Sequence, residues 1–158
     1  MAKEEKNNKK NNKSFNNQSE FEQKLVDLSR VTRVTKGGKQ LSFRACIVLG
    51  DGRGQIGYGV AKGKDVQIAI TKAVAQAKKR LIKVKIDKGT LPHEIKIKFK
   101  AARIMIRPGK QGRGVIAGGV LRTVLELAGY KDAVAKIYGS KNKINNVKAA
   151  YQALKNLK

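Results

Sequence analysis

The chain has 158 residues, of which 41% are hydrophobic, enough to bury the core of one medium domain or two small ones. Lysine and arginine number 36 against 11 acidic residues, so the formal net charge is +25. This charge favours nucleic acid as the partner over any neutral ligand. The basic segments do not form one lysine-rich amphipathic helix, and no apolar stretch reaches the roughly 20 residues of a membrane span. We therefore expect no membrane partner.

The first 19 residues consist mainly of Lys, Asn and Glu, with Phe15 as the single aromatic side chain. This composition buries too little apolar surface to offset the entropy of ordering, and it predicts a disordered basic tail over residues 1–19. The N-terminus also lacks the apolar core of an export signal, which indicates a cytoplasmic protein. The one cysteine, Cys46, lies in the apolar run 45–49, where a buried and inert thiol is expected.

Two hairpins are predicted in the first half of the chain. The β-branched residues 31–35 indicate a strand that runs into the turn 36–39, Lys-Gly-Gly-Lys. Two cations on a flexible tip can serve as a phosphate finger, although a bare hairpin tip would need no function. The run 45–49 then stops at Asp51-Gly52, a dipeptide typical of a tight hairpin, and a second strand follows.

One face of that second strand carries almost no side chains. Bulky residues at positions 56, 58 and 60 alternate with Gly57, Gly59 and an alanine, so a large partner could approach the glycine face. Three cations, Arg53, Lys62 and Lys64, are expected to flank this face. Asp65 is a candidate N-cap for a helix over about residues 66–82, whose N-terminus would favour a phosphate. The stretch indicates a platform for a polyanion, and a glycine-rich hairpin without a ligand is the alternative.

A dinucleotide-binding fingerprint is spelled by the glycines at positions 52, 54 and 57. The fingerprint requires a strand followed by a helix, whereas these glycines lie in a hairpin that enters another strand. We therefore reject nucleotide binding by this motif.

The second half of the chain reads as strand, helix, strand, helix. A strand over residues 95–100 changes parity at Ala101-Ala102, which indicates a bulge or a break. A second basic loop around Pro108 precedes a helix of roughly residues 116–128, which Gly129 is expected to end. A strand over residues 133–138 and a last helix follow. The loop 109–112, Gly-Lys-Gln-Gly, spells the motif with which KH domains clamp single-stranded RNA, but a strand precedes it where KH domains have a helix.

These elements predict an α+β protein with two domains. Residues 20–84 form a three-stranded sheet with one helix, residues 85–94 a connector, and residues 95–158 a two-layer α/β domain with two helices. No convergent set of acids, bases or metal ligands is visible, and His93 has no second histidine at metal-ligand spacing. We expect no enzymatic activity, no cofactor and no metal.

Several motifs in one unbroken order resemble the family of ribosomal protein five of the small subunit, bacterial type. The matching motifs lie at residues 30–38, 48–62, 89–91, 114–122 and 136–142, within a resemblance that covers roughly residues 22–157. The resemblance implies a first domain like the double-stranded-RNA-binding fold without its first helix, and a second domain whose fold is shared with some kinases. The sequence departs from the family in its longer Asn/Lys tail and in ending right after the last helix.

The resemblance implies a structural role in the small ribosomal subunit, in assembly and in decoding accuracy near the messenger entry channel. Its expected partners are small-subunit ribosomal RNA, the fourth and eighth small-subunit proteins and messenger RNA, without a homo-oligomer. The loop matching residues 36–39 approaches ribosomal RNA near the spectinomycin site in the family. A free single-stranded-RNA chaperone of KH type is the alternative, and a small kinase is a third reading that lacks a carboxylate for magnesium.

The residues expected to contact RNA are all cations, glycines or a polar loop residue: Arg33, Lys36, Gly37, Gly38, Lys39, Arg53, Gly57, Gly59, Lys62, Lys64, Arg103, Arg107, Lys110, Arg113, Lys141, Asn142 and Lys143.

Overall fold

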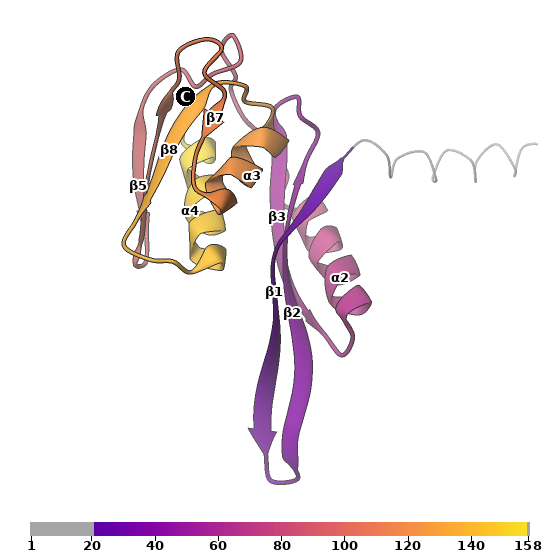
Figure 1. Ribbon diagram of the computed structural model, residues 1–158. Helices are drawn as coiled ribbons and strands as arrows, with labels where there is room; N and C mark the ends of the chain where they lie inside the picture. The colour runs from indigo at the N-terminus through magenta and orange to yellow at the C-terminus, as the bar shows by residue number, and fades with distance from the viewer. Residues whose placement is uncertain (1–20, 158) are drawn as a thin grey trace, which may run out of the picture.

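The computed structural model describes residues 21–157, which form two four-stranded sheets and three helices (Figure 1). The tail expected over residues 1–19 lies outside the described residues. The first sheet has the strand order β1-β2-β3-β4 and the second the order β5-β6-β8-β7. In chain order, the elements of the described residues are β1 (Glu22–Thr35), β2 (Gly38–Gly50), β3 (Gln55–Gly63), α2 (Val66–Lys78), β4 (Ile82–Lys83), β5 (Ile95–Phe99), β6 (Ala102–Pro108), β7 (Val115–Ile116), α3 (Gly119–Ala128), β8 (Ala133–Tyr138) and α4 (Lys143–Lys155).

The predicted fold class is confirmed, with one addition to the first sheet. The sequence predicted three strands and a helix reaching about residue 82, whereas α2 ends at Lys78. Ile82 pairs instead with Ile56 of β3 and forms the short fourth strand. The chain leaves the helix early because an isoleucine gains more from a place beside the sheet than from one further helical turn on the surface.

A β-bulge explains why the start of β1 fits neither a helical nor a strand period. The register of β1 on β2 shifts between Leu25 and Asp27, so that Val26 is the extra residue. Val26 packs against the core that lies toward the second sheet. Beyond the bulge, β1 and β2 continue as a regular antiparallel ribbon to a turn at Lys36-Gly37, and this hairpin projects past the rest of the molecule (Figure 1).

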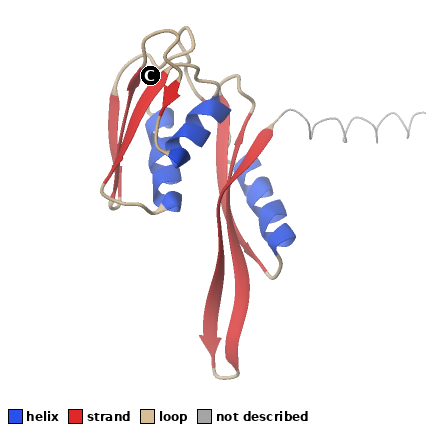
Figure 2. Ribbon diagram, in the orientation of Figure 1, coloured by secondary structure: helices blue, strands red, loops and turns tan. Residues whose placement is uncertain are grey.

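The second sheet carries α3 and α4 on the face that looks toward the first sheet, so both helices lie between the two sheets (Figure 2). The parity change at Ala101 proves to be a break, because β5 and β6 form a hairpin in which Ile97 pairs with Ile104. The helix expected from residue 116 begins at Gly119, because Ile116 is held in parallel pairing with Val134 of β8. Gly129 ends α3 with φ 96° in the left-handed region, as predicted.

The two halves share the larger of two hydrophobic clusters among the described residues, and the smaller one lies between the first sheet and α2. Cys46, Val48 and Ile56 of the first sheet belong to the same buried cluster as the apolar faces of α3 and α4. The backbone N–H of Gly52 donates to the Leu127 carbonyl at 3.0 Å. The boundaries 20–84, 85–94 and 95–158 stay a prediction, but both halves contribute side chains to this one buried cluster.

Candidate nucleic-acid interface

The β1–β2 hairpin places the predicted phosphate finger in open solvent. Lys36, Gly37 and Lys39 are exposed, and a Cβ added at Gly37 would meet nothing within 4 Å. Val34 and Leu41 near the tip are 74% and 52% exposed. A two-stranded ribbon with exposed apolar side chains is marginally stable alone, so the hairpin is built to lie against a partner.

A row of three side chains crosses the first sheet on the face that looks toward the second domain. The strand register sets Ser29 of β1 opposite Arg44 of β2, and Arg44 opposite Lys62 of β3. Arg33 lies on the same side of the ribbon four residues further toward the tip, opposite Gln40. We call Arg33, Arg44 and Lys62 the basic hairpin face.

The hydrogen bonding of the row Ser29, Arg44 and Lys62 is incomplete within the part of the chain that the structure describes. The Arg44 Nε and the Ser29 Oγ are both buried and have no hydrogen-bond partner there. Like charges directly opposite one another on neighbouring strands are unfavourable, and each unpaired buried polar group costs on the order of 1–3 kcal/mol. An anion that accepts from Arg44, Lys62 and Ser29 together would remove both costs.

Arg44 was missed by sequence reasoning, and a signal for it was available. Once the two turns are placed at residues 36–39 and 51–54, counting pairs back from each turn sets Arg44 beside Lys62. The apolar run 45–49 that follows Arg44 predicts a buried strand, and it gives no sign that the residue before it contacts a ligand.

The prediction that RNA approaches Gly57 and Gly59 is wrong. Both glycines are buried, and α2 covers their face. A Cβ added at Gly59 would lie 1.9 Å from the Ala73 carbonyl oxygen, and one at Gly57 would lie 2.5 Å from that of Ala77. The bare strand face therefore admits the backbone of a helix of the same chain.

The three cations expected around that face do not gather. Arg53 lies in the loop before β3, whereas Lys62 and Lys64 lie at the other end of this nine-residue strand, about 30 Å away at the usual rise per residue. The Asp51 carboxylate accepts from the backbone N–H groups of Arg53 and Gln55, each at 2.8 Å, and so holds the loop at Arg53. Asp65 occupies the expected N-cap position of α2 without a side-chain capping hydrogen bond.

The second basic loop has an acidic residue, Asp132, beneath it. Asp132 is 7% exposed, and its Oδ1 accepts from the backbone N–H of Gly114 at 2.7 Å. Backbone hydrogen bonds from Gly114, and further ones from Gly112 and Arg113, hold the pKa of Asp132 below its usual range. The carboxylate thus organises the loop from inside, while Arg113 and Lys110 are exposed.

The remaining cations of this region stand on the open face of the second sheet. Arg103 and Arg107 project from β6 away from the buried Ile104 and Ile106. The Gly-x-x-Gly loop lies between β6 and β7 rather than between two helices, so the KH alternative loses the helices that define its clamp.

The loop before α4 combines capping with charge. The Asn142 Oδ1 accepts from the backbone N–H groups of Ile144 and Asn145, at 3.1 and 3.4 Å. The Lys143 Nζ lies 3.4 Å from the Asp27 carboxylate across the domain boundary. Lys141 is exposed. Asn142 and Lys143 therefore take part in contacts within the chain.

Within residues 21–157 no group of three or more His, Cys, Asp or Glu residues could hold a metal ion, and no helix is long and apolar enough to cross a membrane. Burial raises the pKa of Cys46 to about 11, with a smaller contribution from Asp27, which matches the expected inert thiol. His93 is exposed. A projecting basic hairpin and two buried unpaired donors are features typical of proteins that bind polyanions.

Two family models match the chain: the N-terminal domain of ribosomal protein S5 over residues 21–85 and its C-terminal domain over residues 97–158. Together they cover most of the sequence in the expected order. The chain belongs to the ribosomal protein S5 family. This family consists of structural, non-enzymatic proteins, which agrees with the prediction from the sequence.

Curated relatives named small ribosomal subunit protein uS5 are 46% identical in Mycoplasmopsis synoviae, over 94% of this chain, and in Hydrogenobaculum, over 88%. The protein named uS5c of Rhodomonas salina is 46% identical over 96% of this chain. The chain spans 60%, 74% and 91% of these three relatives, respectively.

Proposed function

We propose that this protein is a structural component of the small ribosomal subunit that binds ribosomal RNA through its basic hairpin face and hairpin tip. The row Ser29, Arg44 and Lys62 carries the proposal, because the Ser29 Oγ and the Arg44 Nε are buried and unpaired and the exposed Lys62 adds a second cation beside Arg44. A phosphate of an RNA strand supplies the acceptors and the opposite charge at once. Membership of the S5 family supports RNA of the small subunit as that strand.

The finer role follows from the family resemblance. The protein supports subunit assembly and contributes to decoding accuracy near the messenger entry channel, in contact with messenger RNA. Its protein neighbours are the fourth and eighth small-subunit proteins. It acts in cytoplasmic ribosomes. We propose RNA contact for the other exposed predicted cations as well, while Arg44 and Ser29 are added to the set. These cations are Arg53, Lys64, Arg103, Arg107, Lys110, Arg113 and Lys141.

The test measures binding of the isolated protein to small-subunit ribosomal RNA as a function of salt. Replacing Arg44 and Lys62 together by Gln should lower the slope of log K against log salt by roughly 1.4–1.8, since each phosphate contact contributes about 0.7–0.9. Lys72→Gln with Lys79→Gln on the exposed side and end of α2 is the matched control. A wild-type slope for the Arg44 and Lys62 pair would contradict the interface.

Co-sedimentation separates this role from that of a free RNA chaperone. The proposed component stays with reconstituted small subunits in moderate salt, whereas a chaperone would leave them. A misreading reporter in cells that carry the Arg44 and Lys62 variant then tests the contribution to decoding, with growth and subunit yield measured alongside.

A further inference from the structure

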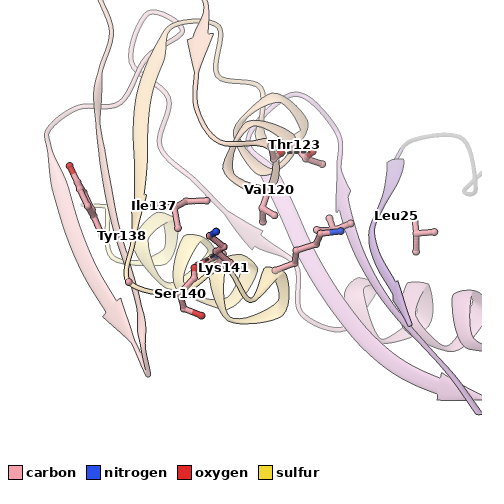
Figure 3. Close-up of a pocket in the computed structure, with 12 residues that line it drawn as sticks. Leu25, Val120, Thr123, Ile137, Tyr138, Ser140 and Lys141 are labelled. Carbon is pink, nitrogen blue, oxygen red and sulfur yellow. Dashed lines mark hydrogen bonds between the residues drawn. The ribbon is translucent and has the colours of Figure 1, made fainter. Parts of the chain in front are cut away.

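A pocket of about 680 Å³ lies between the first strand of the first domain and the two helices of the second (Figure 3). Its apolar wall consists of Val26 from β1, Val120 from α3 and Ile137 from β8, while Leu25 borders the pocket with its side chain turned to the other face of the sheet (Figure 3). The volume of the pocket falls within the range of small-molecule sites, roughly 300–1,000 Å³.

One polar side chain of the wall is buried and incompletely bonded. Asn146, in the first turn of α4, is 2% exposed. Its Nδ2 donates to the Ser140 carbonyl at 3.1 Å, but its Oδ1 has no hydrogen-bond partner among residues 21–157. A buried acceptor without a donor is costly, so the pocket calls for a ligand that brings a hydroxyl or amino donor.

The side of the pocket formed by the start of α3 and by Lys141 favours a negatively charged ligand group. The first turn of α3 lines it through Gly119 and Val120, and this helix starts at Gly118 without a side-chain cap, which leaves its first N–H groups free for an acceptor. Lys141 lines the pocket and is exposed, while Lys143 is engaged with Asp27 at 3.4 Å. A phosphate is the anion that suits a helix N-terminus next to a lysine.

We propose that this pocket binds one ribonucleotide unit. The base lies on the apolar wall, a ribose hydroxyl donates to the Asn146 Oδ1, and the phosphate lies at the start of α3 beside Lys141. The unit comes from one of two sources, an unstacked nucleotide of an RNA strand or a free nucleoside monophosphate. The proposal goes beyond the proposed function, which rests on the basic hairpin face and needs no nucleotide pocket.

The first arm uses the full chain and the four ribonucleoside monophosphates in a calorimetric titration. A Cβ added at Gly119 would meet nothing within 4 Å, so Gly119→Phe fills the pocket without a backbone clash. We expect Gly119→Phe to abolish binding of the monophosphates. Lys141→Ala should weaken binding about fivefold, and so should a 2′-deoxy ligand on the wild type, because each of these two changes removes one polar contact. Lys72→Ala on the exposed face of α2 should bind as the wild type does.

The second arm uses an RNA hairpin with one unpaired nucleotide and the same hairpin with an abasic site at that position. For an RNA source, the abasic site weakens binding to the wild type but not to Gly119→Phe, and free monophosphates do not bind. If the ligand is a free nucleotide, the monophosphates bind in the first arm, and the abasic site has the same effect on the wild type and on Gly119→Phe in the second. The proposal is overturned if no monophosphate binds and the abasic site has equal effects on both proteins. Equal binding of ribose and deoxyribose ligands would overturn the contact with Asn146.

Discussion

Tyr58 of β3 and Tyr151 of α4 meet edge to face across the boundary between the two domains, with ring centroids 4.8 Å apart. The Arg80 guanidinium lies over the Tyr58 ring at 5.4 Å, and the Tyr151 hydroxyl donates to the Arg80 carbonyl at 3.0 Å. One contact thus joins the first sheet, the end of α2 and the last helix. It makes the relative placement of the halves a property of packing rather than of the connector.

The tyrosine pair predicts a shared loss of stability. Tyr151→Ala removes the ring contact and the hydrogen bond, and it should lower the free energy of unfolding by about 2 kcal/mol. Because both halves share a core, unfolding in urea should remain one transition for the wild type and the variant. Tyr138→Ala, at an exposed ring on β8, is the control and should cost less than about 0.5 kcal/mol. Two separate transitions in the wild type would show that the domains fold independently.

Gly59 is predicted to matter for folding. The Cβ of Gly59→Ala would lie 1.9 Å from the Ala73 carbonyl oxygen, so α2 must move off the sheet. We expect destabilisation of about 3 kcal/mol, and RNA binding should fall only in proportion to the folded fraction. Gly37→Ala at the open hairpin tip is the matched control and should leave the melting temperature unchanged. A stable Gly59→Ala protein with impaired RNA binding would restore the glycine face as an RNA contact.

Local chemistry made much of the fold predictable, and tertiary contacts explain what was missed. The turn at Lys36-Gly37, the stop of α3 at Gly129 and the strand β8 all depend on residues close in sequence. The local sequence could not predict that α2 covers the glycine face of β3, because a strand face without side chains allows close approach of a helix and of a nucleic acid equally well. The bond from Gly114 to Asp132 joins residues 18 apart and gave no local signal.

The hairpin tip is predicted to act as a phosphate contact. Lys36→Ala with Lys39→Ala should flatten the salt dependence of binding to ribosomal RNA by roughly 1.4–1.8 in the log-log slope. Both side chains are exposed at the tip, so the melting temperature should not fall. Salt titrations of RNA binding and thermal melts of the same samples provide the measurement. An unchanged slope would remove the tip from the interface while leaving Arg44 and Lys62 in place.

Asp132 is predicted to make the second basic loop sensitive to acid. Backbone hydrogen bonds, that from Gly114 first, hold the pKa of Asp132 below its usual range in the folded protein. A carboxyl with a depressed folded pKa contributes stability that is fully present above its unfolded pKa, near 4, and is lost as pH falls through the folded pKa.

Asp132→Asn keeps an acceptor for the Gly114 N–H but removes the charge. The variant should therefore melt below the wild type at pH 7, and the two melting temperatures should converge as pH falls below about 4. Asp87→Asn, at an exposed carboxylate in the segment after β4, should show no such convergence. The measurement is the melting temperature from pH 7 down to about pH 2.5, with amide hydrogen exchange at Gly114 as a local readout. If the difference in melting temperature persists at low pH, the Asn side chain destabilises the loop through its shape or hydrogen bonding. The charge of Asp132 would then not be what holds the loop.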